Sequence, residues 1–245
     1  GCLTKAQVEA AEKIYSGPVD AAGRSISGGG APPGSERLWA KYYLDDENGG
    51  LPYMFPLTRN GLGDLFSDPR RPENWNIDQF NFTEDYKKLD VMQSLYDSSN
   101  PDITRFAEAG GKLIIYMGLG DVSMPNTIIN YYKKVQRLAG GAEKANKFAR
   151  LFLLPGVDHC SGGPGADQVD YLGYLEDWVE KASPPDVLVA THVENAEASR
   201  GEARRPIFSR PVYPYPAYSK YSGKGDPAKA QSFERAIPEP SPFSR

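Results

Sequence analysis

Asp121 and His159 are the residues whose types and spacing could carry out chemistry. Each follows an apolar run typical of a buried strand: Lys112–Met117 precedes Asp121, and Ala149–Leu154 precedes His159. A carboxylate that orients a histidine lets the histidine take a proton from a hydroxyl nucleophile. The two residues lie 38 positions apart (159 − 121), which suits one strand–helix–strand unit. The spacing therefore predicts an acid–base pair for nucleophilic catalysis.

Predicted strands and helices alternate between residues 96 and 200, so we expect an α/β fold with a parallel sheet and right-handed crossovers. In open α/β sheets, functional residues gather at the carboxyl ends of the strands, where Asp121 and His159 should meet. The hydrophobic pattern also predicts helices and one edge strand around these two strands. They are the helices Ile103–Ala109, Asn126–Leu138 and Val169–Lys181, and the edge strand Val187–His192.

The regions on either side look less regular. Residues 1–95 are rich in Gly, Pro and aromatic residues. A short helix is expected at 4–15, where Thr4 and Gln7 form a capping box, and a short helix or turn at 85–95. The Gly-rich run 28–34 predicts a surface turn, because no strand–helix signal of a phosphate loop accompanies it. Residues 201–245 are rich in proline and predict an extended tail packed on the body.

Composition excludes several classes of partner. The net charge of −4 argues against nucleic acid, which needs clustered Lys and Arg, and no apolar run approaches the length of a membrane span. Two histidines and two cysteines show no zinc-ligand spacing. The acidic turn 45–48 could hold calcium weakly, although a solvated loop is the better interpretation. The start, Gly1-Cys2-Leu3-Thr4, has no Met and no signal-peptide pattern, so we expect a removed start or a piece of something longer.

A nucleophilic serine for the pair is not found in the chain. Ser161 neighbours His159 but lacks the Gly-x-Ser-x-Gly elbow, and Ser27 lacks a preceding apolar strand. His192 lies in the expected edge strand, so we interpret it as structural. Asp158 is expected to be solvated or turn-forming rather than the catalytic acid. The serine is therefore expected upstream of this chain.

The two cysteines leave three alternatives open. Cys2 stands at the start of the chain, and Cys160 directly follows His159. They could pair with each other, or each could pair with a cysteine outside this chain, as a leftover cysteine in an exported protein suggests. They could also be two unrelated buried thiols.

Several motifs bear a family resemblance. The stretch from Asn100 to Pro185 resembles the tannase/feruloyl esterase family of α/β-hydrolases, and its His-Cys-x-Gly-Gly-Pro-Gly motif is specific. Similar segments near both ends extend the resemblance over nearly the whole chain. The matching residues are Gly110–Ile114, Asp121, Thr127, Tyr131–Tyr132, Pro155–Gly156, His159–Cys160, Gly162–Gly165 and Trp178–Glu180, with Cys2–Gln7, Ile14–Pro18, Gly34–Glu36, Trp39, Arg210–Pro216 and Tyr221–Asp226.

The resemblance implies a carboxylic ester hydrolase that releases phenolic acids such as ferulate or gallate by a Ser-His-Asp mechanism. Asp121 would be the acid and His159 the base. Residues 1–95 would be the remainder of a lid and 96–200 the C-terminal half of the α/β-hydrolase sheet. The family's serine, the cysteine before it and a calcium-binding lid loop all lie upstream. This chain alone would hold no cofactor and be inactive.

The resemblance also implies partners and a setting. Cys160 would pair with the cysteine beside the upstream serine, and Cys2 with another absent cysteine, in a secreted or periplasmic protein. Aromatic residues of the lid could receive the phenolic group, although packing of the lid explains any one of them equally well. They are Trp39, Tyr42, Tyr43, Tyr53, Phe55 and Trp75.

Two departures and a rival function remain. The family's His-Gly-Trp-x-Asp is here Met117-Gly-Leu-Gly-Asp121, and Tyr213 and Glu234 or a neighbour replace a common cysteine pair. The alternative is a non-catalytic binding or interaction module that keeps the half-fold. Separation of Asp121 from His159 beyond hydrogen-bond reach would favour the module.

Overall fold

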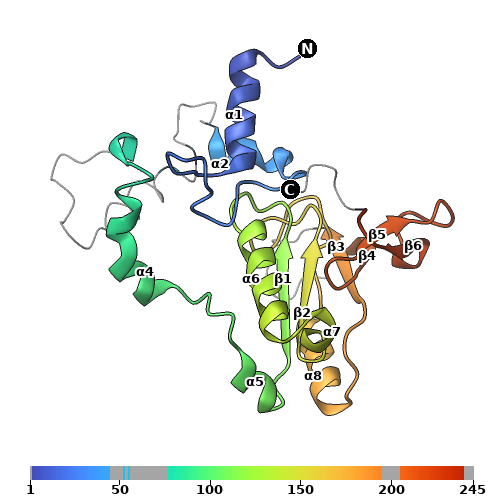
Figure 1. Cartoon of the computed structure of the whole chain (residues 1–245). Helices are drawn as coiled ribbons and strands as arrows, with labels where there is room; N and C mark the ends of the chain where they lie inside the picture. The colour runs from blue at the N-terminus through green and yellow to red at the C-terminus, as the bar shows by residue number, and fades with distance from the viewer. Residues whose placement is uncertain (1, 45–51, 53–54, 56–76, 195–204, 240–245) are drawn as a thin grey trace. The chain divides into compact units, whose positions relative to one another are not determined.

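The computed structural model describes residues 2–44, 52, 55, 77–194 and 205–239 (Figure 1). Contacts divide the chain into two compact units. The first comprises Gly1–Asn100 with Val122–Asn130, and the second comprises Pro101–Asp121 with Tyr131–Arg245. The acidic turn 45–48 and the aromatic residues Tyr53 and Trp75 lie outside the described residues.

Helix α1 (Lys5–Ser16) opens the first unit, as the sequence predicts. The Gln7 N–H donates to the Thr4 hydroxyl at 3.4 Å, and the Thr4 N–H donates to the Gln7 side-chain oxygen at 2.9 Å. These two bonds satisfy N–H groups that the first turn leaves without helical partners. Gly17, at φ 69°, ends the helix in a conformation that favours glycine. The predicted capping box is confirmed.

The Gly-rich run 28–34 is packed rather than a simple surface turn, so that prediction is wrong. Its Ala31 N–H donates to the Ile14 carbonyl at 2.9 Å. A Cβ on Gly28 would lie 2.2 Å from the Thr127 hydroxyl oxygen and 2.6 Å from its Cα. The glycines are required by close backbone approach, which the local composition alone does not show.

The core of the first unit is small and aromatic. It contains η1 (Glu36–Leu38) and α2 (Trp39–Tyr43), and the Tyr43 hydroxyl donates to the Val122 carbonyl at 3.0 Å. A second cluster forms around η2 (Ile77–Gln79), η3 (Tyr86–Leu89) and α4 (Asp90–Tyr96). Two consecutive helical segments, η3 and α4, thus lie where a short helix or turn was expected. The aromatic residues Trp39, Tyr42 and Tyr43 therefore serve packing here.

The second unit is built on β1 (Leu113–Gly118) and β2 (Ala149–Leu154), which pair in parallel from Leu113↔Ala149 to Gly118↔Leu154. Helix α5 (Thr104–Glu108) precedes β1, while α6 (Pro125–Leu138) and α7 (Ala142–Ala145) lie between the strands in sequence. Tyr132 of α6 is fully buried, and its hydroxyl oxygen lies 2.9 Å from the Ala149 carbonyl oxygen. The predicted parallel α/β arrangement is confirmed (Figure 1).

Helix α8 (Tyr171–Glu180) covers one face of this pair. Its Tyr171 and Tyr174 pack on a cluster that includes Phe152 and Leu154, and Tyr171 stacks on Tyr116 with ring centroids 4.1 Å apart. Burial raises the pKa of Tyr171 above its ordinary value of 10.0. On the described residues, no helix is both long enough and apolar enough to span a bilayer.

The expected tail, 201–245, contains strands in its described part, which corrects that prediction. Strand β3 (Leu188–Glu194) pairs antiparallel with β4 (Arg205–Val212). Strands β5 (Tyr218–Tyr221) and β6 (Phe233–Ala236) form a second antiparallel pair, with η4 (Ala230–Ser232) before β6. Pro206 sits beside a register shift, and Pro211 lies in a strand of a two-stranded sheet. Both are places where proline is tolerated. Proline content therefore misled the prediction.

Candidate active site

Asp121 and His159 meet at the carboxyl ends of the two parallel strands. Asp121 follows β1, His159 follows β2, and His159 Nδ1 lies 2.6 Å from Asp121 Oδ2. Asp121 is 2% exposed, whereas the His159 side chain is 60% exposed. The buried carboxylate can accept a hydrogen bond from Nδ1–H, and in that tautomer Nε2 keeps its lone pair and can take a proton from a hydroxyl.

Backbone contacts hold the two loops together. The Gly120 N–H donates to the Val157 carbonyl at 2.7 Å, and the Leu119 N–H donates to the Leu154 carbonyl at 2.9 Å. A Cβ on Gly118 would lie 2.3 Å from the Asp158 carbonyl oxygen and 2.4 Å from that of Val157. Glycine at 118 therefore permits the approach that brings acid and base within reach.

The His159 loop is also braced from within. Asp158 is 7% exposed, and its carboxylate accepts the His159 N–H at 2.7 Å. The Gly162 N–H donates to Asp167 Oδ2 at 2.7 Å, and the Gly165 N–H donates to the Gly156 carbonyl at 2.9 Å. Asp158 is thus turn-forming, as expected, but buried rather than solvated. Its contact with the histidine's own N–H fixes the backbone that carries the base.

His192 supports the far end of the same loop. Its Nδ1 lies 2.7 Å from the Gly165 carbonyl oxygen, and its ring stacks on Phe208 with centroids 4.9 Å apart. Beside it, Thr191 and Gln168 exchange two backbone hydrogen bonds of 2.9 and 3.0 Å. The structural interpretation of His192 is confirmed, and β3 is the element that anchors the loop.

Neither a bonded serine nor a metal site is found at the pair among the described residues. Within them, no serine hydroxyl is hydrogen-bonded to His159, and no group of three or more His, Cys, Asp or Glu side chains could hold a metal ion. The pair can therefore accept and return a proton, but the described part of the chain does not supply a nucleophile beside it.

Both thiols are exposed and unpaired in the structure. The alternative of two buried thiols is therefore wrong, and Cys2 and Cys160 do not bond to each other. Pairing of each thiol with a cysteine outside this chain stays a prediction. Cys160 is adjacent to His159 in sequence, so such a bond would tie the base to the partner segment.

The sequence did not indicate that three residues support the site: Gly118, Asp158 and His192. Gly118 leaves room for carbonyl oxygens of another loop, and the His192 ring contacts a carbonyl oxygen 27 residues away in sequence. Only Asp158 carried a local signal, because a carboxylate beside a loop residue often bonds backbone N–H groups.

The fold and the pair define a class. An aspartate and a histidine delivered after neighbouring parallel strands, in chain order acid then base, are the arrangement of an α/β-hydrolase. The chain belongs to the tannase and feruloyl esterase family, whose model, described as "Tannase and feruloyl esterase", matches residues 1–236. The family and fold expected from the sequence motifs are confirmed.

Curated relatives support this assignment. The chain is 31% identical to a mono(2-hydroxyethyl) terephthalate hydrolase from Piscinibacter sakaiensis, covering 97% of this chain and 42% of that protein. It is 30% identical to a probable feruloyl esterase from Arthroderma benhamiae, covering 96% and 43% respectively. The chain thus spans less than half the length of these relatives.

Solved structures show the same fold. An esterase from Aspergillus oryzae superimposes with a TM-score of 0.74 at 24% identity, covering 96% of this chain and 47% of that one. Feruloyl esterase B from the same organism gives a TM-score of 0.71 at 22% identity, covering 96% and 46%.

Proposed function

We propose that this chain carries the acid and the base of a serine-type carboxylic ester hydrolase that acts on esters of aromatic acids, such as ferulate or gallate. The observation that carries the proposal is the 2.6 Å contact between Asp121 and His159 at the carboxyl ends of β1 and β2. The relatives' names point to one acyl class, since terephthalate and ferulate are both aromatic carboxylates.

In the proposed reaction, a serine from an upstream segment attacks the ester carbonyl while His159 Nε2 takes its hydroxyl proton. Asp121 stabilises the imidazolium that forms and keeps the ring oriented. The tetrahedral intermediate then expels the alcohol, to which His159 returns the proton, and leaves an acyl-serine. Water attacks this ester by the same proton transfers, which releases the acid and regenerates the serine.

The partner in this proposal is the upstream half of the same protein. Cys160 would form a disulfide with a cysteine beside the serine, and its exposed thiol is accessible for that bond. Such a disulfide would require an oxidising setting, so the proposal includes a secreted or periplasmic location. Calcium, if the protein binds it, would belong to a lid loop in the upstream half.

The test compares the chain alone with the chain joined to its upstream half, using methyl ferulate as substrate. The chain alone should show no turnover, and the complete protein should hydrolyse the ester. In the complete protein, Asp121→Asn should lower kcat by about 10⁴-fold, because the amide favours the wrong tautomer of His159. Asp226→Asn, which changes an exposed carboxylate, is the matched control.

Two results would overturn the proposal. Turnover by the chain alone would mean that the nucleophile lies within it. Normal kcat in the Asp121→Asn variant would mean that the pair takes no part in catalysis. An upstream half without a Cys-Ser elbow would instead favour the non-catalytic binding module.

A further inference from the structure

A cavity lies in the second unit, apart from the acid–base pair. It has a volume of about 700 Å³, within the range typical of small-molecule sites. The ends of β2 and β4, the β5–β6 pair and the segment 164–166 form its wall, while neither Asp121 nor His159 lines it. Aromatic and apolar side chains dominate, among them Leu119, Leu154, Pro155, Phe208, Tyr218 and Phe233. Such walls suit a flat apolar ligand.

Arg210 is the cationic residue in this wall. Its guanidinium lies between two rings, 4.5 Å from the centroid of Phe208 and 4.4 Å from that of Phe233. The rings cover its faces, while its edge carries more N–H donors than the single 2.7 Å bond to the Ser209 carbonyl uses. Arg210 takes part in none of the salt bridges found among the described residues. The cavity therefore contains a fixed positive charge with donors to spare.

Partial burial makes this charge a strong anion site. Loss of water lowers the pKa of Arg210 from its ordinary value of 12.5, yet a guanidinium stays protonated at neutral pH. A partly buried guanidinium gains more from a carboxylate than a fully exposed one does, because water screens the attraction less. Its planar donor edge also matches the two oxygens of a carboxylate.

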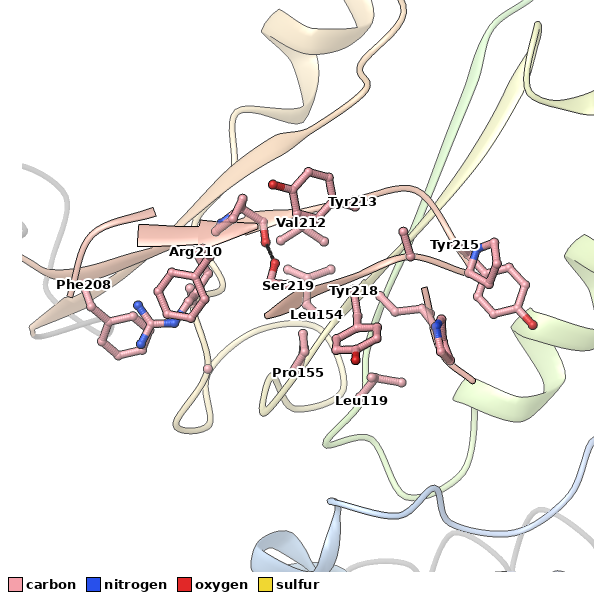
Figure 2. Close-up of a pocket in the computed structure, with 18 of the residues that line it drawn as sticks. Leu119, Leu154, Pro155, Phe208, Arg210, Val212, Tyr213, Tyr215, Tyr218 and Ser219 are labelled. Carbon is pink, nitrogen blue, oxygen red and sulfur yellow. Dashed lines mark hydrogen bonds between the residues drawn. The ribbon is translucent and has the colours of Figure 1, made fainter. Parts of the chain in front are cut away.

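The charge of Arg210 lies at one end of the cavity lining. Figure 2 shows Arg210 beside Phe208 at one end of the drawn residues, with Leu119, Leu154 and Tyr218 some way from them. We propose that this cavity is a binding site for a small aromatic carboxylate, whose acid group bonds Arg210 and whose rings lie against the apolar wall. The site is distinct from the pair at Asp121 and His159, and its occupancy does not depend on hydrolysis.

One other charge lies in the wall. Glu239 also lines the cavity, near the end of the described residues. A bound carboxylate would face repulsion from Glu239, so that the charge of this residue tunes affinity. Glu239→Gln should therefore strengthen binding.

The test measures binding of 2-naphthoate by calorimetry, with 2-naphthalenemethanol as the uncharged analogue. The full 245-residue chain should bind 2-naphthoate at one saturable site and the alcohol more weakly. Arg210→Gln should weaken 2-naphthoate binding by about ten- to a hundred-fold, the range expected for loss of a charge-assisted pair. Arg235→Gln, in neighbouring β6 but outside this cavity, is the control and should bind normally.

Two further measurements distinguish loss of the binding site from misfolding of the variant and from occupation of the cavity by another segment. Arg210→Lys keeps the charge but loses the planar edge, so it should retain intermediate affinity and an unchanged circular dichroism spectrum. The same titration of the complete protein asks whether another segment fills the cavity. Equal binding by Arg210→Gln, equal affinity for the alcohol, or no binding by the complete protein would each overturn the proposal. Ester hydrolysis is scored separately, so either proposal can fail alone.

Discussion

Gly118 controls the distance between the acid loop and the base loop. Its hydrogen leaves room for two carbonyl oxygens that a Cβ would approach to 2.3 and 2.4 Å. Both carbonyls belong to the main chain of the loop that carries His159, at Val157 and Asp158, so they cannot swing away as a flexible side chain would. The acid–base geometry therefore depends on a residue without a functional group.

We expect Gly118→Ala to lower the free energy of unfolding by about 1–3 kcal/mol, because the added methyl must push the loops apart. In the complete protein, kcat for methyl ferulate should also fall. Gly223→Ala is the control: its φ of 80° strains alanine, but nothing lies within 4 Å of the new Cβ. It should cost stability alone. An unchanged kcat in Gly118→Ala would contradict this role of Gly118.

At the residue scale, the sequence predicted contacts that follow from residue type and local position. Asp121 and His159 followed from residue type and strand-end position, and the Thr4 cap from a local spacing rule. Gly118 and His192 act through carbonyls that are distant in sequence, so no local pattern indicates them. Prediction failed where the partner was a backbone atom on another element.

At the element scale, apolar runs were the reliable signal. Strand β2 has the bounds expected for it, Ala149–Leu154, because most of its side chains are apolar and buried, and its one charged residue, Arg150, is paired with Asp186. Helix α6 begins at Pro125, a favoured first residue. Strands β4 to β6 were missed because prolines and exposed polar residues hide their alternation, and their pairing partners lie on other segments.

Strand β1 has one edge without a described neighbour. The Leu113 N–H donates toward β2, to the Phe148 carbonyl at 2.7 Å, and so does the Leu119 N–H, to the Leu154 carbonyl at 2.9 Å. Successive backbone N–H groups of a strand point to opposite edges of the sheet. The N–H groups of Ile114 and Tyr116 therefore point away from β2, to the other edge. Unpaired edges of this kind invite another strand.

In the chain alone, alternate backbone amides of β1 should therefore differ in their rate of hydrogen exchange. We expect the amides of Ile114 and Tyr116 to exchange faster than those of Ile115 and Met117, as resolved by NMR. Addition of the upstream half should protect the fast pair by adding a strand. Slow exchange at all four amides in the chain alone would contradict an open edge.

At the scale of the whole molecule, the chain spans under half the length of its relatives, and both cysteines are exposed. We expect a maleimide reagent to add to two thiols in the chain alone, as counted by intact mass. In the complete protein under oxidising conditions, Cys160 should be unreactive until a reductant is added. Free Cys160 there would show that the predicted disulfide does not form.

The contact between the buried Asp121 and the exposed His159 exists wholly inside this chain. A separately produced polypeptide that supplies the serine would then find its proton acceptor already oriented. We expect the two fragments to behave as a split enzyme, in which the onset of ester cleavage reports their reassembly. The chain could thus serve as one half of a complementation sensor. Cleavage of a colourless chromogenic ester to a coloured product would be the readout.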